Sequence, residues 1–491
     1  MRFSSGVSAT TLTIIAVIVA LLIGIAIGYG VASAVIKPPA PVTVTSTITT
    51  TVTTTLAPGA PATVTVTQTL TKTATVTQTK TVTVAPTPVK PKIKEIIIGL
   101  IEPLTGAHAV FGIEAKQAAE LMIDIINNEL GGIKSLGGAK LKLVVEDAGE
   151  SPETGKLAAE KLISQYHPPI VVGAYISRIT AGIAEVTERE KVILVMDALV
   201  DWLTQKGWKY VFRAAPKASD HGRSAARFVL EMAKKAGLTI KTAVVMNEDS
   251  IFGHNVAEGA IEILEKAGVK VLDHIEYPYD IADATPLVSK LLDLNPDIVI
   301  SIPYFHDGVL IAKAIQGMGF KPMFIAGAGA CGYTDPESIK AAGKAVLWFT
   351  NTYSYNPARP TPWNKYIVKK FIERYGKLPT EAGGIIFYSI MVIKEALEKA
   401  GEMFPDDPLN PDHLRAAFLA LDLNDRNSIA AQLYPTGRIK FNENGDNIYA
   451  GTAVLQVQLK DGKLVPVVVW PDAEPGVQPI FPRPDWPGAK G

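Results

Sequence analysis

Two short segments place polar side chains at the ends of predicted strands, where ligand sites are often built. In GAYISRIT, residues 173–180, Ser177 lies between a strand and a helix and can act as the helix N-cap. The unpaired N–H groups and the dipole of a helix start favour an anion such as a carboxylate. In DALVDWLT, residues 197–204, Asp197 and Trp202 follow another strand. Each of these three side chains could also have a purely structural role, and for Ser177 that role is to cap the helix.

Motifs for catalysis and cofactors are largely missing. GAGACG at residues 327–332 has dinucleotide-fingerprint spacing, but the next helix begins only near Asp335 and the following strand has no acidic residue for a ribose. We therefore interpret these glycines as a loop that needs close backbone approach or a free φ angle. The sequence has no nucleophile elbow, Walker loop, HExxH pair or EF-hand loop. We predict no catalytic residues, no metal site and no cofactor.

Composition restricts the partners. Lysine plus arginine and aspartate plus glutamate each total 48, so the chain shows no basic footprint and no nucleic-acid partner is predicted. Cys331 is the one cysteine, which excludes an intramolecular disulfide and a CxxC metal site. Stability must therefore come from an apolar core.

Apolar runs alternate with amphipathic helical segments from residue 95 onward, which is typical of parallel sheets covered by helices. The first predicted strands cover 95–104, 140–149, 168–175, 192–197 and 210–215, with helices beginning near 111, 152, 178 and 199. After Pro216 the pattern restarts with a helix over 221–237, strands at 242–249, 269–278, 297–304, 322–329 and 345–353, and helices at 253–267, 285–294, 307–318 and 336–341. The last third is mostly helical from 360 to 421 and then hairpin-like. We predict an α/β fold of two doubly wound parallel-sheet lobes, with a ligand cleft beyond the carboxyl ends of their strands.

The N-terminal region has its own organisation. After a short segment, residues 1–11, the chain carries no charge over residues 12–36, long enough for a membrane-spanning helix of roughly 20 residues. We predict an uncleaved anchor. A cleaved signal peptide with the site Ala32-Ser33-Ala34, or prepilin-like processing near Gly6, are the alternatives.

Threonine alternates with other residues between the anchor and the lobes. Alternation favours a strand, but the run extends from about Thr43 to Thr87, far beyond ordinary strands of roughly 3–10 residues, and prolines interrupt it. We therefore interpret residues 37–92 as a disordered Thr/Pro-rich linker, a stalk that holds the lobes outside the cell. O-glycosylation of this stalk would protect it.

Seven blocks of the globular part occur in one recognisable order. They are IIIGLIEPLTGAHAVFG, INNELGGI, LKLVVEDAGESPETG, VVGAYISRITAGIAEV, YVFRAAPKASDHGRSAARFVLE, DIVISIPYFHDGVLIAKAIQGMGF and TGRIKFNENGDN. In this order they resemble the leucine/isoleucine/valine-binding protein family, the branched-chain amino acid receptors of ABC importers with the periplasmic binding protein type 1 fold. The resemblance covers about residues 96–469. It implies three crossovers, near 216, 352 and 434, with a first lobe of 94–215 plus 356–432 and a second of 216–351 plus 433–491.

The resemblance also implies a ligand site. In family members that bind amino acids, a serine matching Ser177 holds the ligand carboxylate, and an aromatic residue matching Tyr304 reaches in from the second lobe. Phe111 matches a tyrosine of the better-known members. A threonine that grips the ligand falls near Leu199, and an acid that pairs with the ammonium falls near Ala328, so both polar groups are lost here.

A buried ammonium without an acceptor costs several kcal/mol, so these losses bear on the ligand. Asp197 can replace the lost acid. The alternative is a ligand without an ammonium, such as a small amide, a urea-like compound or an aromatic carboxylate. The predicted ligand-binding set also includes Tyr175, Ala198 and Trp202.

We therefore expect an extracellular, membrane-anchored solute-binding receptor. It would capture a small solute, a branched-chain or other amino acid in the first place, and deliver it to the permease and ATPase subunits of an ABC importer. A ligand-binding sensor ectodomain that works with a partner protein and an enzyme that uses the cleft remain the other two classes.

Overall fold

The computed structural model describes residues 42–55, 61–74, 93–278 and 280–490. The chain divides into two compact units, Met1–Val89 and Lys90–Gly491. Among the described residues, no helix combines the length and apolar character needed to cross a membrane. The predicted anchor at residues 12–36 and the two processing sites lie outside the described residues.

The described part of the first unit is an antiparallel pair of strands. β1, Val42–Thr55, pairs with β2, Pro61–Ala74, over the full length of both, from Val42 opposite Ala74 to Thr55 opposite Pro61. We predicted a disordered linker for these residues, and that prediction is wrong. The alternation of threonine with other residues here marks β-strands. The physical reason is that β-branched threonine and valine favour extended backbone, so a long alternating run that folds back can pair with itself. The other residues of the stalk lie outside the described part.

The first sheet of the second unit has five parallel strands in the order β4-β3-β5-β6-β7. Their bounds are β3 Glu95–Glu102, β4 Lys140–Asp147, β5 Ile170–Gly173, β6 Ile193–Val195 and β7 Val211–Phe212. The helices between them are α2 Ala109–Asn128, α3 Pro152–Tyr166 and α4 Ser177–Arg189. The helix expected near Leu199 is only a 3-10 turn, Asp201–Thr204, because the segment DWLT is too short for further α-helical hydrogen bonds before Gly207.

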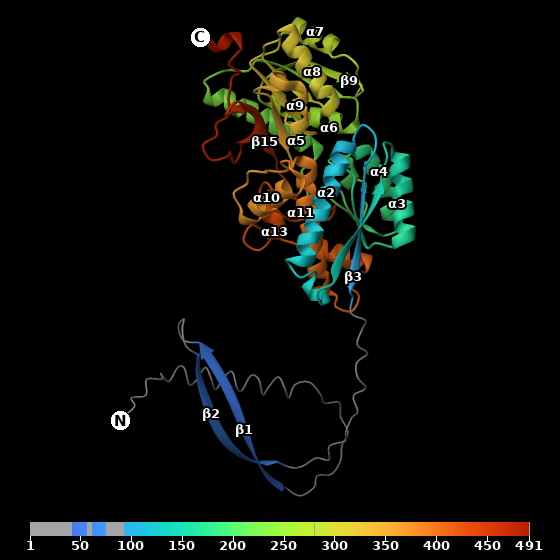
Figure 1. Ribbon diagram of the computed structural model, residues 1–491, viewed down its shortest axis with the longest axis vertical. Coiled ribbons are helices and arrows are strands. Elements are labelled where there is room, and N and C mark those ends of the chain that lie inside the picture. Colours follow the sequence, from blue (N-terminus) through green and yellow to red (C-terminus); the bar gives the residue numbers. More distant parts are fainter. Residues whose placement is uncertain (1–41, 56–60, 75–92, 279, 491) are drawn as a thin grey trace, which may run out of the picture. The chain divides into compact units, whose positions relative to one another are not determined.

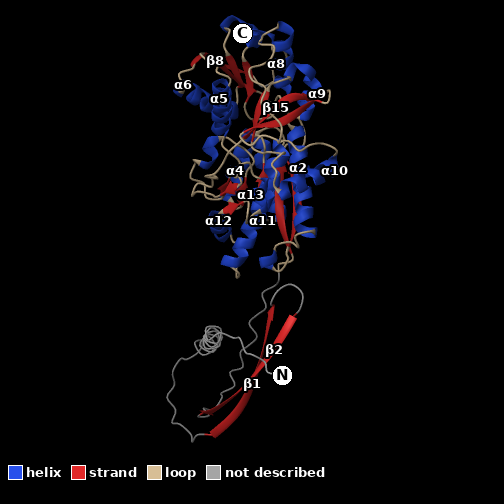
Figure 2. Ribbon diagram, turned by 90° about the vertical axis from the view of Figure 1, so that its left-hand side faces the viewer, coloured by secondary structure: helices blue, strands red, loops and turns tan. Residues whose placement is uncertain are grey.

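The second sheet has seven strands in the order β16-β15-β12-β11-β10-β8-β9. β8 Thr242–Glu248, β9 Lys270–Tyr277, β10 Ile298–Ile302, β11 Phe324–Gly327 and β12 Thr350–Tyr353 are parallel, while β15 Ala453–Lys460 and β16 Lys463–Trp470 are antiparallel additions. Its helices are α5 Ala218–Lys235, α6 Ile251–Lys266, α7 Thr285–Leu294, α8 Phe305–Met318 and α9 Pro336–Ala342. In Figure 2 the strands lie between α5 and α6 on one side and α8 and α9 on the other.

The C-terminal third covers the first sheet before it joins the second. After α10, Pro362–Tyr375, the long helix α11, Glu381–Met403, packs against α2, and α12, Pro411–Leu419, packs against α11. Figure 1 shows α2 and α11 on one side of β3, and α3 and α4 on the other. β13 Leu423–Asn424, α13 Ile429–Leu433 and β14 Arg438–Ile439 follow. The lobe boundaries themselves stay a prediction.

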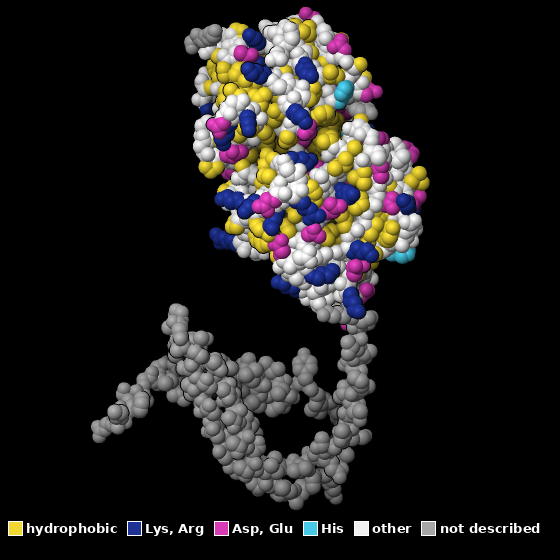
Figure 3. Space-filling view, in the orientation of Figure 1, with side chains coloured by type: hydrophobic (Ala, Val, Ile, Leu, Met, Phe, Trp, Pro, Cys, Tyr) yellow, Lys and Arg dark blue, Asp and Glu magenta, His cyan; other side chains and the backbone are white. Residues whose placement is uncertain are grey.

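Burial explains why the parallel strands are apolar without alternation. In β8, Ala243 and Val245 belong to the core beneath α5 and α6, whereas Val244 and Met246 belong to a second core on the opposite face. Since successive side chains point to opposite faces, a strand buried on both sides needs apolar residues throughout. The predicted α/β architecture of two parallel sheets is therefore confirmed. On the face shown in Figure 3, acidic and basic side chains are mixed over this unit.

Candidate functional site

The candidate site lies at the carboxyl ends of the first sheet, around the turn after β5. Ser177 is buried at 5% exposure and begins α4. The expectation that it caps the helix is wrong, since Ile176 is the N-cap residue and no side-chain capping bond is formed there. Ser177 lies one position further along because Ile176 still has the extended backbone of a cap. Its hydroxyl, set beside the first amides of α4, is therefore not used for capping.

Four aromatic rings from both sheets meet at this turn. Phe111 of α2 stacks on Tyr175 with ring centroids 4.7 Å apart, and Tyr304, which precedes α8, lies 6.2 Å from Phe111. Phe252 of α6 lies 5.8 Å from Tyr304. Burial raises the pKa of the Tyr304 phenol well above its usual value, so this hydroxyl stays protonated. The structure thus brings together Phe111, Tyr175 and Tyr304 as predicted, and adds Phe252.

The remaining opening between the sheets is narrow. It is lined by Ile176, Ser177, Arg178, Ser250, Ile251, Phe252 and Tyr304, and its free volume is about 10 Å³. That is room for roughly one water molecule, so the two sides are closed on each other. A solute larger than water would fit between these residues only if the two sides moved apart.

Polar side chains from both sides frame this opening. His108 Nδ1 and its backbone N–H both contact the Glu150 carboxylate, and Arg178 Nη2 lies 3.8 Å from the same group. From the second sheet, Glu248 accepts hydrogen bonds from the backbone and hydroxyl of Ser250. Burial raises the pKa of Glu248, while the hydrogen bonds from Ser250 and the charge of Arg178 oppose this shift. Sequence analysis did not single out these groups because isolated charged residues form no motif.

Two buried acids lie at the carboxyl ends of the strands on either side of β5. Glu102 ends β3 and Asp197 follows β6, and both are 0% exposed. The backbone N–H of Tyr175 donates to Glu102 Oε2 at 3.1 Å, whereas Glu102 Oε1 and both Asp197 oxygens have no hydrogen-bond partner within the described part of the chain. Burial and the neighbouring Asp197 raise the pKa of Glu102, and burial raises that of Asp197. Asp197 was predicted as a site residue, whereas Glu102 was missed.

A third buried acid connects the site to the second sheet. Glu381, the first residue of α11, accepts a hydrogen bond from the Tyr175 hydroxyl at 2.9 Å and another from the backbone of Ser354. His221 of α5 bonds the Ser354 hydroxyl at 2.9 Å and that of Thr352 at 2.8 Å. Burial lowers the pKa of His221, so the neutral imidazole is favoured. Hydrogen bonds thus connect Tyr175, at the end of the first sheet, through Glu381 of α11 to residues that follow β12 of the second sheet.

The glycine-rich loop around Ala328 is tightly packed. Ala328 is fully buried and its N–H donates to the Ser301 carbonyl at 3.0 Å. A Cβ on Gly329, whose φ is +66°, would lie 2.8 Å from the Phe252 ring, and one on Gly332 would lie 2.4 Å from the Pro303 carbonyl oxygen. The interpretation of these glycines as close-approach positions is confirmed.

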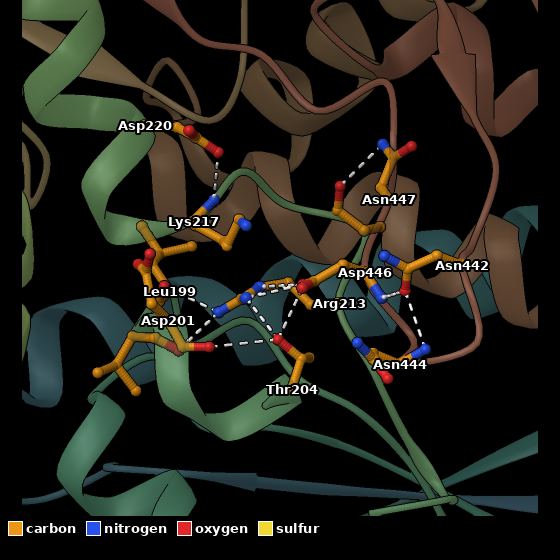
Figure 4. A network of polar contacts seen from close by, with 12 residues as sticks. Leu199, Asp201, Thr204, Arg213, Lys217, Asp220, Asn442, Asn444, Asp446 and Asn447 are labelled. Atoms are coloured by element: carbon orange, nitrogen blue, oxygen red, sulfur yellow. Dashed lines mark hydrogen bonds and ion pairs between the residues drawn. The ribbon is translucent and has the colours of Figure 1, made fainter. Parts of the chain in front are cut away.

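Ala198 and Leu199, which belong to the predicted ligand-binding set, are buried, at 0% and 3% exposure. Arg213 binds the backbone at Leu199 (Figure 4). The Arg213 Nη1 donates to the carbonyl oxygens of Leu199 and Val200 at 2.8 and 2.7 Å. Leu199 therefore contributes a fixed backbone as well as an apolar side chain.

Trp202 has different neighbours from the other predicted aromatic residues. Its half-buried ring lies 6.3 Å from that of Trp208, and the Lys206 ammonium lies 4.3 Å from its centroid. Within the described residues, no ring contact joins it to the four aromatic rings around Ser177. Its assignment to the ligand site stays a prediction. No group of side chains in the described part of the chain is arranged to hold a metal ion.

Comparisons with known proteins agree with this geometry. Residues 95–463 match the family model described as periplasmic binding protein. The Leu/Ile/Val-binding protein homolog 8 of Brucella abortus strain 2308 is 27% identical over 387 residues, which cover 76% of this chain and 91% of that protein. Homolog 7 of the same strain is 28% identical over 400 residues, covering 78% and 93%.

Solved structures show the same fold. A leucine-binding protein LivK from Thermotoga maritima superimposes with a TM-score of 0.64 at 24% identity, covering 77% of this chain and 99% of that one. A solute-binding protein of an ABC transporter from Rhodopseudomonas palustris BisB5, in complex with 3,4-dihydroxybenzoic acid, gives 0.64 at 21% identity, covering 78% and 99%. Since the family model matches most of the sequence, the chain belongs to the periplasmic binding protein family, and it has the type 1 fold of that family.

Proposed function

We propose that this protein is the solute receptor of an ABC importer, which captures a small carboxylate-bearing solute between its two sheets and delivers it to the permease. The observation that carries the proposal is the buried Ser177 at the start of α4, surrounded by aromatic rings from both sides. The helix start supplies amide donors and a favourable dipole for the carboxylate. The rings exclude water from the solute body.

The preferred ligand class is an α-amino acid, a branched-chain one in the first place. The curated relatives carry the name Leu/Ile/Val-binding protein, and the solved neighbours include a leucine-binding protein. The chain also supplies buried carboxyl groups beside the rings, at Glu102, Asp197 and Glu381, which suit a solute with a positive group.

An aromatic carboxylate is the second candidate. The stacked pair of Phe111 and Tyr175 could hold an aromatic ring, and a solved neighbour is in complex with 3,4-dihydroxybenzoic acid. The loss of polar side chains at Leu199 and Ala328 is compatible with either candidate, because the buried acids lie elsewhere in the site.

The setting of the receptor is part of the proposal. Residues 12–36 would anchor the chain in the membrane, residues 37–92 would link the anchor to the receptor, and the lobes of 94–215 plus 356–432 and 216–351 plus 433–491 would lie outside the cell. The uncharged stretch of 12–36 and the long Thr-rich segment after it support this arrangement.

The test is a ligand panel on the purified full chain, monitored by melting of its tryptophan fluorescence. A ligand at about 100 times its Kd adds roughly 2.7 kcal/mol of stability, which appears as a raised melting temperature. We expect amino acids or aromatic carboxylates to produce this shift. No shift by any amino acid, amide or carboxylate would contradict the proposal.

A serine variant locates the carboxylate. In Ser177→Ala we expect the affinity for the active compound to fall roughly 10-fold or more, because a hydrogen bond to a charged group is lost. The matched control is Ser338→Ala in α9, which is equally buried and whose hydroxyl has no partner among the described residues. Equal affinities of the two variants would place the carboxylate elsewhere.

A further inference from the structure

The unexplained feature of the candidate site is its pair of buried acids. Glu102 is the last residue of β3 and Asp197 follows β6, and these two strands flank β5, which leads into the turn before Ser177. Both are 0% exposed, and three of their four carboxyl oxygens receive no hydrogen bond within the described part of the chain. Buried carboxyl oxygens without partners are costly, so such a pair needs a compensating group.

The protein does not supply that group. Neither pKa is lowered by a lysine or an arginine within the described residues. The Tyr175 backbone N–H donates to Glu102, the Asp197 backbone lowers the pKa of its own carboxyl, and the two carboxyls interact with each other. The neighbouring Tyr388 of α11 also has a buried hydroxyl without a partner. Two carboxylates can only accept hydrogen bonds, so the pair forms a bond with itself only when one of them carries a proton.

We propose that Glu102 and Asp197 together bind the ammonium group of the solute. This inference rests on the proposed function and names the half of the ligand that Ser177 does not hold. An ammonium has three donors and a positive charge, which match the three acceptor oxygens and the negative charge of the pair. Glu102 accepts the backbone N–H of Tyr175, and Ser177 follows two residues later at the start of α4, so one α-amino acid bound at this turn can engage both.

Binding should then release a proton. Without a solute, the pair shares one proton, because two adjacent buried carboxylates cannot both ionise. An incoming ammonium favours the fully ionised pair, and the displaced proton goes to solvent. Affinity for an α-amino acid should therefore rise with pH until both carboxyls are ionised in the free protein. The Tyr388 phenol faces Asp197 and also Glu381, and burial raises its pKa, which keeps it neutral.

The test uses the full chain and three probes that share the isobutyl side chain: leucine, 4-methylpentanoate, which lacks the amino group, and 3-methylbutylamine, which lacks the carboxylate. We expect leucine to bind and 4-methylpentanoate to bind at least 30-fold more weakly, since removal of one member of a buried charge pair costs 2 kcal/mol or more. Calorimetry of leucine binding in buffers of different ionisation enthalpy should show proton release.

Variants separate this site from general damage. Glu102→Gln and Asp197→Asn keep shape and remove charge, and each should weaken leucine binding by roughly 30-fold or more and abolish proton release. Glu395→Gln is the control, because Glu395 is a half-buried carboxyl of α11 that accepts the Ser428 hydroxyl, and it should bind leucine like the unaltered chain. The melting temperature of each unliganded variant reports on folding.

The outcomes are distinct. If 4-methylpentanoate or an aromatic carboxylate binds as tightly as leucine, or if both variants bind leucine normally, the receptor proposal survives and the acid-pair inference is overturned. If none of the amino acids, amines and carboxylates binds, the proposed function fails and the inference fails with it.

Discussion

Replacement of Asp446 by asparagine should destabilise the protein strongly. The Arg213 side chain is 0% exposed, and its Nε and Nη2 donate to Asp446 Oδ1 at 3.0 and 2.7 Å. Thr204 donates its hydroxyl to the other carboxylate oxygen at 2.7 Å. In Asp446→Asn the Arg213 guanidinium keeps the carbonyl oxygens of Leu199 and Val200 as acceptors. It loses its negatively charged partner, because its other hydrogen-bond partners in the described chain are neutral.

The magnitude follows from burial. Removal of one partner of a buried ion pair typically costs 3–5 kcal/mol, and the retained carbonyl contacts place our expectation near the lower end, at about 3 kcal/mol. The control is Asp422→Asn. Asp422 pairs with Arg438 and Lys440 at 3.2 and 2.9 Å but is 45% exposed, so we expect a loss of about 1 kcal/mol or less.

The assay is urea unfolding followed by tryptophan fluorescence, with the free energy of unfolding extrapolated to water. A loss in Asp446→Asn that is no larger than that of Asp422→Asn would show that Arg213 does not depend on this carboxylate. Because Arg213 holds the backbone of Leu199, solute affinity should fall together with stability.

Three further changes test other parts of the structure. Gly222→Ala should cost about 1–3 kcal/mol in urea unfolding, because its Cβ would lie 1.8 Å from the Val256 carbonyl oxygen where α5 crosses α6. Tyr175→Phe should lose about 1–3 kcal/mol in the same assay, since Glu381 loses its phenol donor. Burial raises the pKa of Asp307 to about 8, so the native state holds this proton more tightly than the unfolded chain. The contribution of the Asp307 proton to the free energy of unfolding is complete below about pH 4 and is lost as the pH rises through 8. In unfolding curves measured from pH 4 to 9, Asp307→Asn should therefore reduce the pH dependence of this free energy by a few kcal/mol. Identical pH profiles for the unaltered chain and the variant would contradict the assignment.

The fold was largely predictable because its signal is repeated along the chain. Each parallel strand is an apolar run of fixed length, and a strand such as β10, IVISI, is buried at every position. Such runs have few other interpretations when helices separate them. The Thr-rich segment was misjudged because its signal is ambiguous: alternation is compatible with a paired strand and with an unpaired chain. The unusual length of the run led us to predict an unpaired chain, whereas Val42–Thr55 and Pro61–Ala74 form paired strands.

The site was only partly predictable because its acids carry no spacing signal. Ser177 was found since a strand, a turn and a helix start surround it. Glu102 and Glu381 lie almost 280 residues apart in the sequence and meet at Tyr175 only in the fold. The one signal for Glu102 was a carboxylate directly after an uninterrupted apolar strand, IIIGLIE, where a charged side chain must face either water or a ligand.

The charges around Tyr175 favour one of the two proposed ligand classes. Glu102, beside Asp197, accepts its backbone N–H and Glu381 accepts its hydroxyl, whereas Arg178, a cation that lines the opening, lies beside Glu150. An aromatic carboxylate would add negative charge to a region that already holds three buried acids. That region could accept it only with further protons, at a cost of about 1.4 kcal/mol for each pH unit above the pKa of the group protonated. An α-amino acid brings its own compensating charge, so the same acids that disfavour a benzoate-like solute favour an ammonium.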